Sequence, residues 1–212
     1  MHRARAWHAA TAVVAVVALV LQLVLVIQGG RVLDESDQPE LGVRLARFVA
    51  YFTVQSNLLV AVTAAQLARD PSRDGTVWRA VRLAAFAGIT VTGVVHFVLL
   101  RPLLDLDGAD YVADKLLHMA VPLLAVIGWA VFGPRPRIDA RAVGLALSWP
   151  LAWLAVTLAV GAISGWYPYP FLDHREPEGV AGVAVSCVGI TLLFLLLLGA
   201  AARWDRRATV AP

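Results

Sequence analysis

The sequence predicts an all-α polytopic membrane protein, with six transmembrane helices in a single integral membrane domain over residues 1–212. Three observations predict this class. Of the 212 residues, 59% are hydrophobic and only 16% are charged, which is more apolar surface than a soluble domain of this length can bury. Six apolar runs approach or exceed the roughly 20 residues that cross the hydrocarbon core of a bilayer as a helix. Arginines gather in alternate connections between these runs, as they do in membrane proteins of fixed orientation.

The six predicted spans occupy residues 9–27, 48–67, 81–100, 116–132, 142–163 and 179–202. The first follows His2, Arg3 and Arg5 and therefore resembles a signal peptide. It is longer than the apolar region of a typical signal peptide, and no cleavage site of small residues follows it. We expect it to be retained as the first helix.

The second and third spans carry polar residues at helical spacing. In the second, Thr53, Ser56 and Asn57 are three or four residues apart and share one face of a helix, whereas Gln55 points elsewhere. In the third, Gly88, Thr92 and His96 are four residues apart. This stripe of small and polar residues lets a neighbouring helix approach closely.

The fourth span is the shortest and contains Pro122. Asp114, His118 and Pro122 are four residues apart, and a proline at position 122 leaves the carbonyl of His118 without its helical donor. The carboxylate of Asp114 is placed to orient the imidazole of His118 and to fix its tautomer.

The last two spans carry fewer polar residues. Trp149, Trp153 and Thr157 line one face of the fifth, which predicts helix packing or a groove for an acyl chain. The sixth holds Cys187, the one cysteine of the chain, so no intramolecular disulfide can form.

The distribution of charge predicts the orientation. The two termini and the second and fourth connections hold 12 of the 18 basic residues, whereas the other three connections hold 11 of the 15 acidic residues. By the positive-inside rule both termini are cytoplasmic. Seventeen arginines against one lysine are typical of a GC-rich bacterial genome, so we expect a multi-pass protein of a bacterial plasma membrane. Basic residues in short loops point to membrane orientation and not to nucleic acid as a partner.

With this topology, the polar residues of the second, third and fourth spans all lie in the outer half of the membrane. Ionisable groups are expensive at membrane depth and are by default functional. Thr53 is therefore a candidate nucleophile with a histidine as its base, and Asn57 or a second histidine is a candidate donor to an oxyanion. The alternative is that these side chains only bond across helices and hold them together.

Several function classes are excluded by the sequence. It holds no glycine-rich phosphate loop, no pair of cysteines at CxxC spacing and no HExxH motif. We therefore expect no cofactor, no metal ion and no ATP-driven transport. The expected partners are membrane lipids, and the oligomeric state is left open.

The stretch Ser164-Gly-Trp-Tyr-Pro-Tyr-Pro-Phe-Leu-Asp-His174 resembles the outer-loop signature of the androgen-induced gene family of multi-pass membrane proteins. Asp114-Lys-Leu-Leu-His118 followed by Pro122 is similar to its Asn-x-x-x-His segment, and Phe52-Thr53 to its threonine-bearing segment. Ser56 stands where the family has an aspartate.

This resemblance implies an intramembrane threonine hydrolase of fatty-acid esters, with Thr53 as nucleophile and His118 as base. The lipid-like substrate would enter from the outer leaflet. Asn57, Ser56, His96, Asp114 and Trp153 are the predicted supporting or substrate-binding residues. The alternative function is non-enzymatic binding or transport of a lipid or small molecule in the same pocket.

Overall fold

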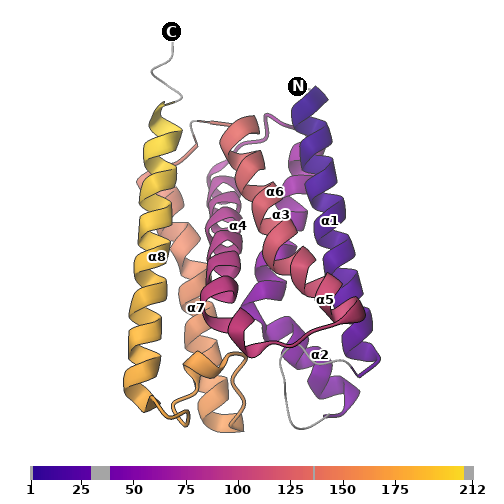
Figure 1. The fold of residues 1–212 in the computed structure, drawn as a ribbon. Helices are drawn as coiled ribbons and strands as arrows, with labels where there is room; N and C mark the ends of the chain where they lie inside the picture. The colour runs from indigo at the N-terminus through magenta and orange to yellow at the C-terminus, as the bar shows by residue number, and fades with distance from the viewer. Residues whose placement is uncertain (1, 30–38, 136, 208–212) are drawn as a thin grey trace.

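The computed structural model describes residues 2–29, 39–135 and 137–207, which form an all-helical bundle without strands among them (Figure 1). Four residues of the first connection that enter the charge count, Arg31, Asp34, Glu35 and Asp37, lie outside the described residues. Among the described residues, five helices are long and apolar enough to cross a membrane, and the number is six if the bent pair α2 and α3 counts as one span. Helix α1 begins and α8 ends at the same end of the bundle (Figure 1).

The spanning elements follow the predicted order. Single helices correspond to the first, fifth and sixth predicted spans: α1 (His2–Ile27), α7 (Ala140–Ser164) and α8 (Gly179–Arg207). The second corresponds to α2 (Leu41–Ala50) and α3 (Phe52–Arg69), and the third to α4 (Thr76–Val95) and η1 (His96–Leu100). The fourth corresponds to four consecutive elements, α5 (Gly108–Lys115), η3 (Leu116–Ala120), α6 (Val121–Ile127) and η4 (Gly128–Phe132). Two short 3₁₀ turns, η2 (Arg101–Leu103) and η5 (Pro170–Leu172), lie in the connections.

The second span differs from the expected continuous helix over residues 48–67. The chain bends by 66° between α2 and α3, so residues 48–50 belong to α2 and the second helix of the pair begins at Phe52. Tyr51 is extended at the bend, with φ −63° and ψ 130°. Its N–H still reaches Arg47 O, and its carbonyl accepts from Val54 and Gln55. The bend therefore leaves the backbone hydrogen-bonded, as a membrane interior requires.

The fourth span is longer than expected and begins at Gly108 instead of residue 116. It widens into π-helical turns at η3 and η4. Pro122, the second residue of α6, has no N–H for the carbonyl of His118. A Cβ on Gly93 of α4 would lie only 3.2 Å from this carbonyl, so α4 passes His118 closely at this glycine.

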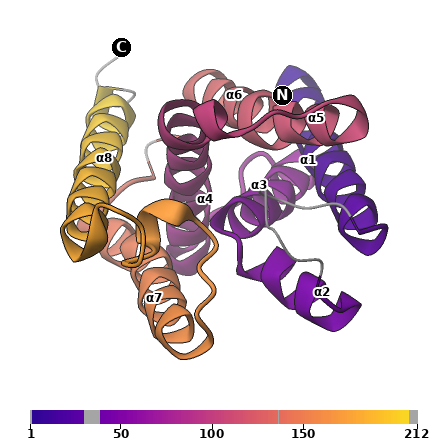
Figure 2. The same cartoon turned by 60° about the horizontal axis from the view of Figure 1, so that its bottom comes forward.

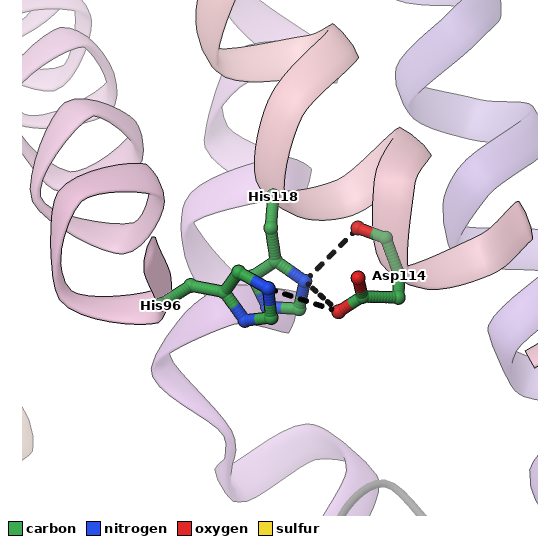
Figure 3. Close-up of side chains that lie close together, drawn as sticks. All are labelled: His96, Asp114 and His118. Carbon is green, nitrogen blue, oxygen red and sulfur yellow. Dashed lines mark hydrogen bonds and ion pairs between the residues drawn. The ribbon is translucent and has the colours of Figure 1, made fainter. Parts of the chain in front are cut away.

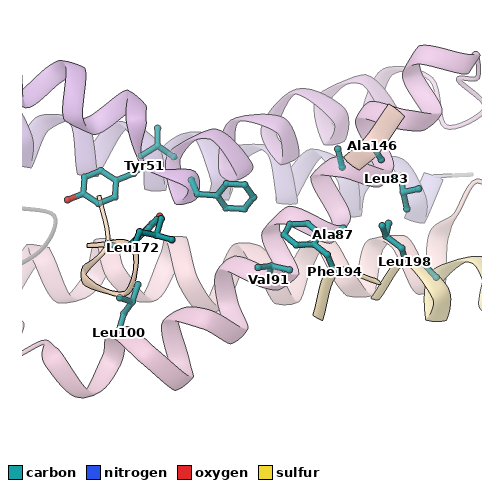
Figure 4. Close-up of a cluster of buried hydrophobic side chains, with 14 of the residues drawn as sticks. Tyr51, Leu83, Ala87, Val91, Leu100, Ala146, Leu172, Phe194 and Leu198 are labelled. Carbon is teal, nitrogen blue, oxygen red and sulfur yellow. The ribbon is translucent and has the colours of Figure 1, made fainter. Parts of the chain in front are cut away.

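Helix α4 is the centre of the bundle. It packs against α3 and α6 on one side and against α7 and α8 on the other (Figure 2). Small residues permit these contacts, since a Cβ on Gly88 would lie 2.6 Å from the Trp149 ring of α7. Apolar side chains of several elements complete the core beside α4 (Figure 4), among them Tyr51, Leu83, Ala87, Val91, Leu172, Phe194 and Leu198.

Candidate functional site

Thr53 lies in the first turn of α3, directly after the bend at Tyr51. Its Oγ1 lies 3.3 Å from Nε2 of His118, although 65 positions separate the two residues in the sequence. The first turn of a helix lies at the positive end of the helix dipole. The bend at Tyr51 thus places a hydroxyl both beside an imidazole and at a helix end that favours negative charge.

His118 in turn contacts Asp114, one helical turn earlier. Its Nδ1 lies 3.0 Å from Asp114 Oδ1 and 3.1 Å from the Asp114 carbonyl (Figure 3). Both of these oxygens accept, so the proton of a neutral His118 sits on Nδ1 and Nε2 faces Thr53 with a free lone pair. The arrangement has the order of a hydroxyl, an imidazole and a carboxylate that activates nucleophiles in hydrolases.

His96 extends the cluster from the end of α4. Its ring stacks on that of His118, with centroids 3.8 Å apart and planes 11° from parallel. His96 Nε2 lies 3.2 Å from the same Asp114 oxygen, within ion-pair distance (Figure 3). The direction of the ring N–H is nevertheless too poor for a hydrogen bond, and neither nitrogen of this buried ring has one. Lys115 Nζ holds the other Asp114 oxygen at 2.7 Å.

These three side chains also form a potential metal-binding group. One ligand atom from each of His96, Asp114 and His118 lies within 4.8 Å of the other two. Two imidazoles and one carboxylate are donors that suit zinc. This group was not predicted from the sequence, where no metal ion was expected, because His96 lies in a different span from Asp114 and His118.

Tyr169 is a site residue that was not among those predicted from the sequence. Its hydroxyl lies 3.3 Å from Thr53 Oγ1 and accepts a 3.2 Å hydrogen bond from the Thr53 N–H. Burial raises the pKa of Tyr169 above its ordinary value, so the phenol stays protonated near neutral pH. The signal that could have identified it is the Tyr-Pro-Phe-Leu element of residues 169–172, which was noted only for its family resemblance.

The polar face of α3 is directed towards backbone groups. The Asn57 amide nitrogen donates to Thr53 O at 2.8 Å and Leu117 O at 3.3 Å. Ser56 Oγ contacts Thr92 Oγ1 at 2.9 Å and donates to two carbonyls of its own helix. These bonds tie α3 to α4 and to the His118 segment. Asn57 thus has its donors engaged, and Tyr169 is better placed beside the hydroxyl.

Gln55 points away from this face, as expected, and accepts from the Trp149 indole at 3.0 Å. Trp153 donates to Ala50 O at 2.8 Å, at the end of α2. The two indoles therefore fasten α7 to the bent segment that positions Thr53. Trp153 has a second role, because its ring lines a cavity.

A cavity of about 210 Å³ reaches Thr53 from between α3, α4, α7 and α8. Its walls are almost entirely apolar, and their polar side chains are few. Thr53 and Tyr169 line it, whereas His96, Asp114 and His118 do not. Of Thr53, His118 and Asp114, only Thr53 therefore lines the space that a substrate would fill.

No protein-family model, no curated protein and no solved structure matches this chain. The similarity to the androgen-induced gene family therefore stays a prediction from the motifs quoted above. Assignment of a function relies on the geometry of the site.

Proposed function

We propose that this protein is an intramembrane hydrolase of long-chain acyl esters, with Thr53 as nucleophile and His118 as general base. The observation that carries the proposal is the contact between Thr53 Oγ1 and His118 Nε2 at 3.3 Å, beside an apolar cavity that Thr53 lines. The proposed kinship with the androgen-induced gene family implies the same chemistry.

In the first step, His118 Nε2 takes the proton of Thr53 Oγ1, and the oxygen attacks the ester carbonyl. The oxyanion forms at the first turn of α3, where the helix dipole and the Tyr169 hydroxyl stabilise it. The C–O bond to the alcohol breaks, and the alcohol oxygen receives the proton from His118. The product of this step is an acyl ester of Thr53.

In the second step, a water molecule gives a proton to His118 Nε2 and attacks the acyl-threonine carbonyl. Collapse of the intermediate releases the fatty acid, and Thr53 recovers its proton from His118. Asp114 accepts from His118 Nδ1–H throughout and keeps Nε2 available as a base. The apolar cavity holds the acyl chain.

The proposed setting is a bacterial plasma membrane with both termini in the cytoplasm. This orientation rests on the arginine distribution, and the common end of α1 and α8 is consistent with it. The site then lies towards the outer face, where an ester from the outer leaflet and water can both reach it.

The test uses the purified full chain in detergent with a long-chain p-nitrophenyl acyl ester and a fluorophosphonate probe. Thr53→Ala and His118→Ala are each expected to abolish hydrolysis and labelling, whereas Thr53→Ser retains part of both. Thr63→Ala is the matched control, because Thr63 is a buried threonine of the same helix that donates only to its own backbone.

Undiminished labelling and hydrolysis in both Thr53→Ala and His118→Ala would overturn the proposal. The non-enzymatic alternative predicts a different outcome. The wild-type protein would bind the ester in the cavity, and neither the wild type nor any variant would hydrolyse it. An apolar cavity with few polar groups is compatible with such binding.

A further inference from the structure

The cluster of His96, Asp114 and His118 has the spacing of a metal site. His96 Nε2 and His118 Nδ1 lie 3.2 and 3.0 Å from the same Asp114 oxygen. Ligands bound to zinc at about 2.0–2.2 Å in tetrahedral geometry are separated by similar distances. Three protein ligands would leave one coordination position open.

His96 gives independent support for a ligand at this place. It is 3% exposed, and both of its ring nitrogens lack hydrogen-bond partners. Leaving a buried polar group unpaired costs about 1–3 kcal/mol, and native structures rarely retain such a group without a reason. A metal ion would supply the missing partner.

The stacking of the His96 and His118 rings shows which movement metal binding requires. Two nearly parallel imidazoles cannot both direct an in-plane lone pair at one ion, so one ring has to turn. His96 is the ring that can do so, since it has no hydrogen bond to lose. Lys115 is the local competitor, because its ammonium group neutralises Asp114 from the other oxygen.

We propose that His96, Asp114 and His118 bind a divalent transition metal ion of the zinc class, and that the bound ion switches the hydrolase off. The second half rests on the proposed function. An ion on His118 Nδ1 displaces the proton to Nε2 of the neutral ring, so that Nε2 donates to Thr53 and can no longer act as its base. The cavity reaches Thr53 but none of the three ligands, so the open coordination position does not face the substrate.

Metal binding is tested without reference to activity. The purified full chain is treated with a chelator, and Co²⁺ is then titrated while its visible d–d absorption is recorded, with Zn²⁺ as competitor. His96→Asn is expected to weaken binding more than about tenfold. His174→Asn, which removes an exposed outer-loop histidine, is the matched control and should bind like the wild type. Lys115→Met should tighten binding, since it removes the competing cation.

The hydrolysis assay tests the switch. Added Zn²⁺ should inhibit the wild type, a chelator should restore activity, and His96→Asn should need at least tenfold more Zn²⁺ for the same inhibition. Equal Co²⁺ affinity of the wild type and His96→Asn would overturn the metal site. Loss of hydrolysis on chelation would overturn the inhibitory role. His96-dependent Co²⁺ binding without any hydrolysis would support the metal site and overturn the proposed function.

Discussion

The Tyr169 hydroxyl contacts Thr53 twice, at 3.2 Å from its backbone nitrogen and at 3.3 Å from its Oγ1. One phenol from the connection between α7 and α8 thus caps the first turn of α3 and touches the proposed nucleophile. Because the Thr53 N–H donates to it, the phenol's own proton remains available to Thr53 or to a bound carbonyl oxygen.

We predict that Tyr169→Phe lowers kcat by about 10²–10³-fold, which is the usual cost of losing one donor to an oxyanion. KM should change little, since the ring still lines the cavity. The matched control is Tyr167→Phe, which removes a hydroxyl that contacts His174 in the connection between α7 and α8; its activity should equal that of the wild type. An unchanged kcat for Tyr169→Phe would exclude the phenol from the reaction.

The buried phenol also predicts a dependence on alkaline pH. Burial raises the pKa of Tyr169 above its ordinary value of 10.0, so the folded protein favours the neutral form more than the unfolded chain does. The resulting stabilisation is complete below pH 10 and is lost as the pH rises through the raised pKa. The difference in tyrosinate absorbance between wild type and Tyr169→Phe gives its titration. A midpoint equal to that in the denatured chain would contradict this prediction.

Asp114→Asn tests the role of the carboxylate that orients His118. An amide at position 114 can donate to His118 Nδ1 and thereby place the imidazole proton on Nε2, where it faces Thr53. We expect kcat to fall by about 10²–10⁴-fold with KM nearly unchanged, as for the orienting carboxylate of other triads. Asp110→Asn, in the first turn of the same helix α5, is the control. A change confined to KM would instead indicate a role in binding.

Much of this architecture could be predicted from local sequence properties. The spans and their order follow from apolar length, because a bilayer allows few other solutions for runs of this length. The contact of α4 with its neighbours through Gly88 and Thr92 also agrees with the predicted stripe of small residues.

Two features of the site could not be predicted in this way. The bend at Tyr51 has neither proline nor glycine, and its backbone bonds are satisfied on both sides, so no local signal marks it. The contact between Thr53 and Tyr169 joins residues 116 positions apart. It depends on how the connection between α7 and α8 folds back over α3, which helical periodicity does not determine.

The close approach of α4 and α7 predicts a stability effect. In Gly88→Ala the new methyl group would meet the Trp149 ring at 2.6 Å, and such overpacking typically costs about 1–3 kcal/mol. The melting temperature in detergent should fall. Gly189→Ala on α8 is the control, because nothing lies within 4 Å of its Cβ position and alanine is the better helix former. Equal melting temperatures for wild type and Gly88→Ala would show that α7 can move away without cost.

The depth of the cavity predicts a preference for acyl-chain length. Leu147 lines it six residues before Trp153 on α7, about 9 Å further along the helix axis at 1.5 Å per residue. Leu147→Trp should therefore obstruct the end remote from Thr53, raise KM for long-chain p-nitrophenyl esters and leave short-chain esters unaffected. Leu145→Trp adds the same bulk to an exposed position outside the cavity and should not alter the preference. An equal loss on short and long esters in Leu147→Trp would mean that the acyl chain does not extend along α7.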